Sequence, residues 1–392
     1  MDSNHIILKK NKDILIRNGH PWIFSGAIQN IGANIDNGSE CSVFNEAGIF
    51  IGYGLYSSKS SIAVRIYSVD REQKLDEKYF YSLIKKSIDF RVALFKNTLN
   101  TGAIRLVNSE GDNLSGLTVD WFAGSIVMQI TSNGIFKRKD LITSIIDNIL
   151  NPANIIVKTD PNFSKQEDYP EIYQTCKGTD EFTEVKENNI LYRIELKKGQ
   201  KTGFYCDQRE NRKLLGSIAF GKKILDICSY TGGFSLNAAA GGAVSVTGVD
   251  SSKPAIDTAN INRDINSFKN IEFIKDDALS FLKKCNTGDY DIIVLDPPKY
   301  AANSSAIKKA IKTYISLNST ALSLLNPGGI LATHSCSGRV SPDEFMDIIK
   351  YAAIDADKKI QVFHTGAHAP DHPFVVPCFE TRYLKSIFLR VL

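Results

Sequence analysis

Apolar runs alternate with helix-length segments over the second half of this 392-residue chain. The runs cover residues 223–228, 245–249, 271–275, 291–295 and 330–333. Parallel strands need a crossover connection, usually a helix, and are buried on both faces, so they appear as continuous apolar runs. The pattern therefore predicts an α/β fold with a parallel, doubly wound sheet. A final strand over 383–391 follows a strand over 359–364 without a helix between them, which predicts antiparallel insertion at the sheet edge.

Two other patterns precede this sheet. Residues 6–68 show short apolar alternations broken by Gly and Asn, which predicts a small β-rich module. Apolar residues at three- and four-residue steps then predict a helix over 73–97. Strands over 117–122, 125–131, 155–159 and 190–196 and a helix over 137–150 follow, as in an α+β domain. We therefore predict three domains, over 1–72, 73–194 and 195–392.

Composition excludes several protein classes. With 43% apolar and 23% charged residues, the chain is neither disordered nor a coiled coil. Its net charge of +4 is too small to indicate a polyanionic partner by itself. The seven cysteines show no zinc-type spacing, so we predict no metal, reduced thiols and a cytoplasmic location. No apolar run approaches the roughly 18 residues of a membrane span, so no membrane partner is expected.

The first apolar run ends in a glycine turn. Residues 225–234 read Leu-Asp-Ile-Cys-Ser-Tyr-Thr-Gly-Gly-Phe, and such glycines let a ligand approach the backbone closely. The turn lacks both the GxGxxG pattern and the Lys-Ser/Thr pair of a phosphate-binding loop, which argues against a nucleotide polyphosphate. The second run ends at Asp250. Its carboxylate suits either the two hydroxyls of an adenosine ribose or the cap of a helix beginning near Pro254, and the glycine turn favours the ribose.

Three further strand ends carry polar side chains. Asp277 follows the third run, where a carboxylate can accept from a purine amine or cap a helix. Asp296 is followed by two prolines, which stiffen the loop that holds the carboxylate. Cys336 follows the fifth run. A buried free cysteine is usually inert, but ligands of open α/β sheets bind at such strand ends, which favours a chemical role.

Together these motifs resemble those of class I S-adenosylmethionine-dependent methyltransferases. Residues 199–212 (GQKTGFYCDQRENR) and 19–26 (GHPWIFSG) resemble, more closely, the bacterial large-subunit rRNA cytosine-5 methyltransferase family. Members of that family carry an N-terminal PUA domain, which is an RNA-binding β-barrel, then a small α+β domain and a Rossmann-like catalytic domain. The resemblance spans nearly the whole chain and implies the same order of domains.

The resemblance also implies a site for S-adenosylmethionine and a site for cytosine. Around the cofactor it places Ser229, Tyr230, Gly232, Asp250, Asp277, Ala278 and Asp296. Around the substrate it places Tyr205, Gln208, Arg209, Pro297 and Lys299. Cys336 would be the nucleophile and Asp296 would lie between the cofactor and the base, so these two are the predicted catalytic residues. Many cytosine-5 RNA methyltransferases carry a second cysteine beside the proline of the Asp-Pro-Pro-Lys motif, and this chain does not.

RNA is the predicted partner. Between Arg193 and Lys223 nine basic residues (193, 197, 198, 201, 209, 212, 213, 222 and 223) stand against three acidic ones. Near the N-terminus a basic and aromatic cluster comprises Lys9, Lys10, Lys12, Arg17, His20 and Trp22. Such clusters suit a phosphate backbone, although a charge run can also be a solvated face. An exposed edge of the β-rich module makes a homodimer conceivable.

The predicted activity is formation of 5-methylcytosine in 23S rRNA through a thiolate adduct at carbon 6. The target base must then be single-stranded or flipped out. The first alternative is methylation of a guanine or adenine nitrogen in RNA by the Asp-Pro-Pro loop, without a covalent intermediate. An NAD-dependent oxidoreductase, which the missing GxGxxG disfavours, and a non-catalytic RNA-binding factor are the others.

Overall fold

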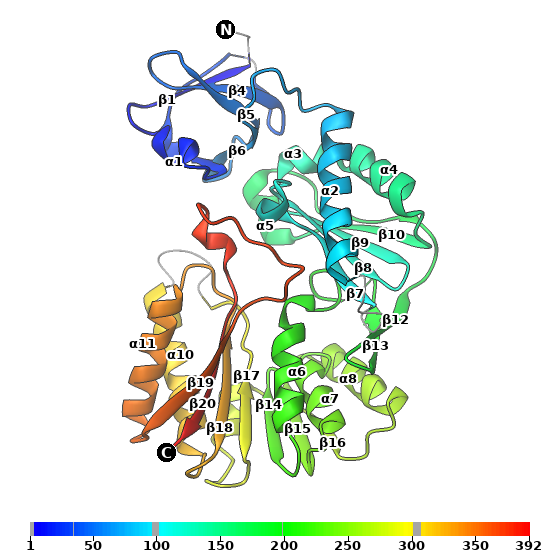
Figure 1. Cartoon of the computed structure of the whole chain (residues 1–392), viewed down its shortest axis with the longest axis vertical. Helices are drawn as coiled ribbons and strands as arrows, with labels where there is room; N and C mark the ends of the chain where they lie inside the picture. The colour runs from blue at the N-terminus through cyan, green and yellow to red at the C-terminus, as the bar shows by residue number, and fades with distance from the viewer. Residues whose placement is uncertain (1–3, 34, 96–101, 198, 301–306) are drawn as a thin grey trace. The chain divides into compact units, whose positions relative to one another are not determined.

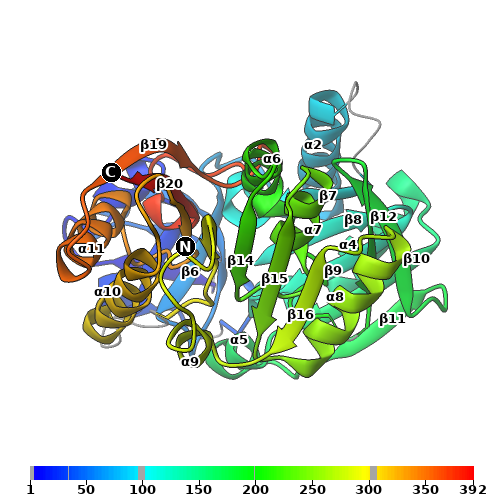
Figure 2. The ribbon, with the colours of Figure 1, turned by 90° about the horizontal axis from the view of Figure 1, so that it is seen from below.

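The structure, a computed structural model, describes residues 4–33, 35–95, 102–197, 199–300 and 307–392. The chain divides into two compact units, each built from segments that are distant in sequence. The first unit comprises residues 1–185, 194–204 and 370–381, and the second comprises 186–193, 205–369 and 382–392. Figures 1 and 2 show their elements. The three-domain division at residues 72 and 194 stays a prediction.

The first unit begins with a six-stranded sheet, as the β-rich pattern predicts. Its strands lie in the order β2 (Trp22–Phe24), β6 (Ile62–Ser68), β5 (Phe50–Tyr56), β4 (Glu40–Phe44), β1 (His5–Leu8) and β3 (Ile28–Ile31). Strand β1 pairs parallel with β4, and the other pairs are antiparallel. The short helix α1 (Ile14–Arg17) contributes Ile16 to the apolar core of this sheet.

A five-stranded sheet follows in the same unit. Its order is β11 (Tyr173–Lys177), β10 (Asn154–Thr159), β9 (Ser125–Ile130), β8 (Leu117–Phe122) and β7 (Ala103–Asn108). The helices are α2 (Glu77–Phe95), α3 (Asn133–Phe136), α4 (Lys139–Leu150) and α5 (Pro161–Glu167). Helices α2 and α4 confirm the two predicted helices, and their apolar faces share one core with the sheet. The sequence pattern missed β7 and β11, in which polar residues interrupt the apolar ones.

The second unit contains a seven-stranded sheet. Its order is β16 (Ile271–Lys275), β15 (Ser245–Asp250), β14 (Lys223–Ile227), β17 (Ile292–Leu295), β18 (Ile330–Ser335), β20 (Lys385–Val391) and β19 (Ile360–Gly366). The first five strands are parallel, as predicted. The final strand, β20, is antiparallel as predicted, but it lies between β18 and β19. The prediction that it forms the edge is therefore wrong, because β19 takes the outer position and leaves a gap that β20 fills.

Helices connect these strands. They are α6 (Arg209–Ile218), α7 (Gly233–Ala240), α8 (Lys253–Ile265), α9 (Ala278–Leu282), α10 (Ile307–Ser323) and α11 (Pro342–Asp355). Helices α10 and α11 pack against each other and share a large apolar core with the sheet. No helix in the described part of the chain is long and apolar enough to cross a bilayer.

A buried ion pair ties a hairpin to helix α6. The hairpin consists of β12 (Phe182–Glu187) and β13 (Ile190–Glu195), and Glu187 at its bend is fully buried. Glu187 Oε1 accepts hydrogen bonds from Arg212 Nε at 2.9 Å and from Nη2 at 2.6 Å. Arg209 Nε lies 3.4 Å from Glu187 Oε2. Because a buried charge is costly, this carboxylate compensates part of the charge that the two guanidinium groups bring into the interior.

Residues 370–381 belong to the first unit although they follow β19 of the second. Asp371 Oδ2 accepts a hydrogen bond from Arg105 N at 2.9 Å, and the Asp371 carbonyl accepts one from Arg91 Nη2 at 2.9 Å. Asn108 Nδ2 donates to the Pro373 carbonyl at 2.9 Å. The chain thus makes a long excursion between β19 and β20, and polar contacts with β7 and α2 hold it.

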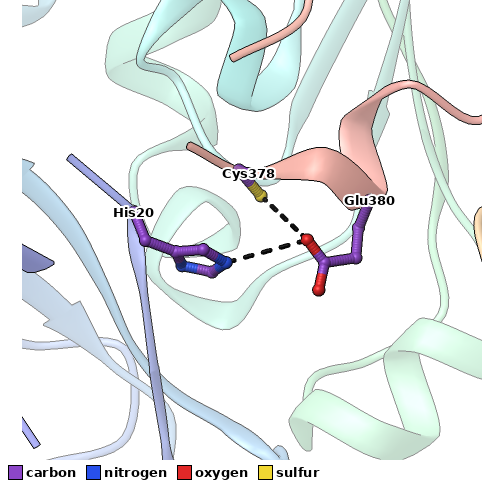
Figure 3. A group of neighbouring side chains, drawn as sticks. All are labelled: His20, Cys378 and Glu380. Carbon is purple, nitrogen blue, oxygen red and sulfur yellow. Dashed lines mark hydrogen bonds and ion pairs between the residues drawn. The ribbon is translucent and has the colours of Figure 1, made fainter. Parts of the chain in front are cut away.

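Figure 3 shows a second anchor of this excursion, formed by His20, Cys378 and Glu380. Cys378 Sγ donates to Glu380 Oε2 at 3.7 Å, and His20 Nε2 lies 3.7 Å from the same oxygen. The backbone N–H of Trp22 donates to His20 Nδ1 at 3.1 Å, which leaves the ring hydrogen on Nε2, facing the carboxylate. Burial raises the pKa of Cys378 and keeps its thiol protonated. These residue types can bind metals, but here the thiol is hydrogen-bonded to the Glu380 carboxylate and the imidazole faces the same oxygen.

Glu187→Ala is expected to reduce the free energy of unfolding by about 3–5 kcal/mol, because it removes the buried carboxylate that pairs with the guanidinium groups of Arg212 and Arg209. Urea unfolding monitored by circular dichroism measures the change. Glu184→Ala, at an exposed position of the same strand, is the matched control and should stay close to wild type. Equal stability of both variants would contradict the structural role of the ion pair.

Candidate active site

The turn after β14 has a strained backbone. Cys228 and Tyr230 have φ angles of 64° and 48°, in the left-handed region that side chains other than glycine rarely adopt. Each such residue costs roughly 1–3 kcal/mol and persists only where its surroundings hold it. Asp250 provides that hold, because its Oδ2 accepts a hydrogen bond from Tyr230 N at 2.9 Å. Strained backbone of this kind is concentrated at functional sites.

Gly232 completes the turn at the start of α7. Its φ angle is 86°, and a Cβ atom at this position would lie 2.6 Å from Cζ of Phe273 on β16. The position therefore requires glycine for two reasons, the backbone conformation and the lack of space.

Asp250 braces the turn and does not cap the following helix. Its Oδ1 accepts from Ser252 N at 2.8 Å, while the Ser252 hydroxyl accepts from Ala255 N and caps α8. The capping role that the sequence left open for Asp250 is therefore wrong. Contact with a ribose stays a prediction.

Asp277, in contrast, is a helix cap. Its Oδ1 accepts a hydrogen bond from Ser280 N at 2.9 Å, at the start of α9, whose first residue is Ala278. The side chain is exposed at the end of β16, next along the sheet from Asp250. Capping fixes the direction of the carboxylate, and contact of Asp277 and Ala278 with an adenine stays a prediction.

Asp296 follows β17 in a buried environment. Burial first, and then the charges of Asp207 and Asp226, raise the pKa of the Asp296 carboxyl to about 7. The side chain of Gln208 hydrogen-bonds to Asp296 and opposes this shift. Gln208 is itself buried, and its Oε1 accepts from Asn211 Nδ2 at 2.6 Å. Near neutral pH the Asp296 carboxyl can therefore either accept or donate a hydrogen bond.

Cys336 lies beside the loop that follows Asp296. Its Sγ donates to the Pro297 carbonyl at 3.9 Å, so the strand ends of β17 and β18 bring the two predicted catalytic residues together. Tyr314 on α10 fixes the turn on both sides of the thiol. Its hydroxyl accepts from Ser335 Oγ at 3.1 Å and lies 3.4 Å from Ser337 Oγ.

Tyr205 lies where the strand ends converge. Its ring makes an edge-to-face contact with Tyr230, with ring centroids 5.2 Å apart. Burial raises the pKa of its hydroxyl, and charges around it raise the pKa further. Those charges belong to Asp207, Cys336, Asp296 and Asp250. Three of the predicted catalytic and cofactor residues thus surround one predicted substrate residue.

Two buried polar atoms at this edge point to a ligand. Asp226 Oδ2 accepts from the backbone and hydroxyl of Ser235 at 3.0 Å and 2.6 Å, but within the described residues its Oδ1 has no partner. The same holds for Ser229 Oγ. An unsatisfied buried polar group costs about 1–3 kcal/mol, so a ligand with hydrogen-bond donors, such as an ammonium group, would fit here. The sequence motif contains Asp226, but no role was predicted for it. An acidic residue inside an apolar strand could have indicated a ligand-binding position.

The predicted substrate residues differ in their surroundings. Lys299 is exposed and Pro297 is buried. Arg209 is turned inward to Glu187, as is Arg212, so part of the basic stretch is structural. Lys198 lies outside the described residues.

At the N-terminus Lys9, Lys10, Lys12 and Arg17 are exposed, whereas His20 is buried. Substrate contacts of all these residues stay predictions.

Comparison with protein families agrees with this geometry. A model of S-adenosylmethionine-dependent methyltransferases matches residues 111–384, and a model of the PUA-like domain matches residues 6–69. The chain belongs to the S-adenosylmethionine-dependent methyltransferase family. The fold class predicted from sequence is confirmed, and S-adenosylmethionine is confirmed as the cofactor of the family.

Two relatives are similar to this methyltransferase over their full length. The ribosomal RNA large subunit methyltransferase I of Aeromonas salmonicida is 34% identical over 391 residues, which cover 98% of each chain. The enzyme of the same name from Pseudoalteromonas atlantica is 34% identical over 396 residues, which cover 100% of each chain.

Solved structures share the fold. A provisionally assigned SAM-dependent methyltransferase from Streptococcus mutans superimposes with a TM-score of 0.86 at 23% identity, over 99% of this chain and 100% of that one. Another provisionally assigned methyltransferase, complexed with SAH, has the same TM-score, identity and coverage.

Gly232→Ala is expected to weaken binding of S-adenosylmethionine at least about tenfold, because the added methyl group displaces Phe273 and the turn. Isothermal titration calorimetry measures the dissociation constant. Gly221→Ala is the matched control, since Gly221 also has a positive φ of 71° but a Cβ atom there meets nothing within 4 Å. Equal weakening in both variants would rule out a specific role for the turn.

The Asp226 carboxyl should make stability depend on pH. Burial raises its pKa to about 7, so in the native state it keeps a proton that the unfolded chain loses near pH 4. The stability this provides is present below pH 4 and is lost as the pH rises through 7. Between pH 5 and 7 the stability of Asp226→Asn should therefore rise relative to wild type, by at most about 1.4 kcal/mol per pH unit.

Urea unfolding without cofactor at pH 5, 6, 7 and 8 measures this difference. Asp355→Asn, at the exposed end of α11, is the control and should keep a constant offset from wild type. A constant offset for Asp226→Asn as well would show that this carboxyl does not bind a proton in the native state near neutrality.

Proposed function

We propose that this methyltransferase forms 5-methylcytosine in large-subunit ribosomal RNA, with Cys336 as the nucleophile. The observation that carries the proposal is the position of the Cys336 thiol, 3.9 Å from the Pro297 carbonyl of the Asp-Pro-Pro loop. The full-length relatives named as ribosomal RNA large subunit methyltransferases support the substrate class.

The thiol activates the base for methylation. Carbon 5 of cytosine is a poor nucleophile until a group adds to carbon 6 and pushes electron density across the double bond. The Cys336 thiolate adds to carbon 6, and carbon 5 then takes the methyl group as the bond between that group and the sulfonium sulfur breaks. A base removes the carbon-5 proton, and elimination of the thiolate restores the ring. S-Adenosylmethionine supplies the activated methyl group. The turn from Ser335 to Ser337, fixed by Tyr314, holds the thiol in place for this addition.

Asp296 orients the base and stabilises the adduct. Its carboxyl, with a pKa of about 7, can donate a hydrogen bond to a ring nitrogen of cytosine as negative charge develops on the pyrimidine. Gln208 fixes its orientation. Tyr205, Arg209, Pro297 and Lys299 complete the proposed surroundings of the base.

The residues at the other strand ends fit the cofactor. Asp226 Oδ1 and Ser229 Oγ are the buried acceptors suited to the ammonium of its methionine part, beside Tyr230 and Gly232. Asp250 would hold the ribose, and Asp277 with Ala278 would border the adenine. Asp296 lies between this group and Cys336.

The PUA-like domain and the exposed lysines near the N-terminus supply contacts to RNA in this proposal. Such contacts offset the unpairing of a flipped-out base. The proposal also includes domain boundaries at residues 72 and 194. It further includes a homodimer formed through the edge of the first sheet.

A second candidate is methylation of a guanine or adenine nitrogen in RNA. The Asp296-Pro297-Pro298 sequence favours it, since similar loops orient an amine in nitrogen methyltransferases. That reaction needs no thiol, so Cys336 separates the two candidates.

The deciding experiment incubates the protein with radiolabelled S-adenosylmethionine and unmodified large-subunit rRNA, and identifies the labelled nucleoside after digestion. We expect label in 5-methylcytidine, and a loss of roughly three orders of magnitude or more in Cys336→Ser. Cys285→Ser, at a half-buried thiol near α9, is the matched control and should retain activity. Label in a purine nucleoside, or full activity of Cys336→Ser, would overturn the cytosine-5 proposal.

A further inference from the structure

Lys385 is a buried lysine on β20. This strand pairs with β18, the strand that leads to Cys336. The backbone of Lys385 pairs with Ser335, and the residue is 5% exposed. Its Nζ donates hydrogen bonds to the Ser337 carbonyl at 2.5 Å and to the Tyr383 carbonyl at 2.8 Å. Lysine is almost never buried without an ionic partner, and two carbonyls only partly compensate a buried ammonium. This position therefore invites a functional explanation.

The lysine ammonium lies at the turn that carries Cys336. The Lys385 backbone pairs with Ser335 and its Nζ ends at the carbonyl of Ser337, so the charge is fixed at the residue that follows Cys336. The electrostatic surroundings agree with this placement. After burial, the largest influence on Lys385 is the charge of the Cys336 thiolate.

Lys385 is a cation at neutral pH. Burial lowers its pKa to about 8, whereas the charges of Cys336 and of Glu344 on α11 oppose this shift. Lys299, after β17, adds to it. Below pH 8 the ammonium form therefore predominates.

Three tyrosines interact electrostatically with Cys336 and are neutral at this pH. They are Tyr205, Tyr300 and Tyr314, and burial raises the pKa of each hydroxyl, to about 12 for Tyr314. The Asp296 carboxyl, next to the Pro297 carbonyl that the thiol contacts, has a pKa of about 7 and opposes the thiolate when it is ionised. Lys385 is a buried cation at this turn that favours the thiolate. A cation beside a thiol favours the thiolate, which is the form that adds to a carbon centre.

We propose that Lys385 is a positioning residue that holds Cys336 as a thiolate, through a positive charge fixed on the carbonyl of Ser337. It deepens the proposed function, since the thiolate is the nucleophile there. Lys385 contacts neither the base nor the cofactor in this scheme and acts through Cys336. A purely structural lysine, in contrast, would hold the two carbonyls without changing the thiol's ionisation.

The test measures the pH dependence of Cys336 alkylation by iodoacetamide in the full-length protein, without RNA or cofactor, by mass spectrometry of the Cys336 peptide. In wild type we expect a midpoint below the ordinary thiol value of about 8.5. In Lys385→Met the midpoint should rise by about one unit or more, and alkylation at pH 7 should slow about tenfold. Lys385→Arg keeps the charge and should restore most of the reactivity.

Two other thiols serve as internal controls. Cys285 is half-buried in the same unit and should react at an unchanged rate in every variant, while the buried Cys206 should stay protected as long as the fold is intact. If Lys385→Met exposes Cys206, the neutral variant Lys385→Gln is used in its place, because glutamine can still donate to the Ser337 carbonyl without carrying charge. An unchanged midpoint in a folded neutral variant, or a wild-type midpoint at or above 8.5, would overturn the proposal.

This readout is independent of methyl transfer. If Cys336→Ser still methylates RNA while Lys385→Met raises the alkylation midpoint, the proposed function fails and the inference about the thiol holds. If Cys336→Ser is inactive but the midpoint does not change, the proposed function stands and the inference fails.

Discussion

The candidate site depends on one geometric constraint, the parallel arrangement of the strands β14, β15, β17 and β18. Parallel strands end at the same edge of a sheet, so residues that follow them meet there even when they are a hundred positions apart in sequence. Tyr205 demonstrates the convergence, because Asp250, Asp296 and Cys336 all act on its hydroxyl. The hydrogen bond from Tyr230 N to Asp250 then joins two of these strand ends into one strained, rigid turn.

Burial decides which groups at this edge carry charge. It raises the pKa of the Asp226 and Asp296 carboxyls to about 7, and it lowers that of Lys385 to about 8. The two carboxyls can therefore hold protons near neutrality while the lysine remains a cation. Away from this edge, Glu187 pairs with two buried arginines of the basic stretch predicted to contact RNA. Charge counted along the sequence thus overstates the charge that is available to a polyanion.

The excursion over residues 370–381 is the least predictable part of the fold. Contacts of Asp371 with Arg91 and Arg105, and of Glu380 with His20, hold it in the first unit although it connects two neighbouring strands of the second. Both flanking strands, β19 and β20, read clearly from the sequence. Their connection does not, since its partners lie more than 250 residues away in the chain.

The sequence by itself determined the α/β class, the five parallel strands and the residues at their ends, because strand burial and helix periodicity leave local patterns. Tertiary structure decided the features that depend on contacts between residues distant in sequence. It placed β20 inside the sheet, assigned the cap of α8 to Ser252 in place of Asp250, and turned Arg209 toward Glu187. It also brought the ammonium of Lys385 to the carbonyl of Ser337, the residue after Cys336. Each of these depends on which groups, distant in sequence, are buried next to one another. Those neighbours determine both the hydrogen bonds and the ionisation of each group.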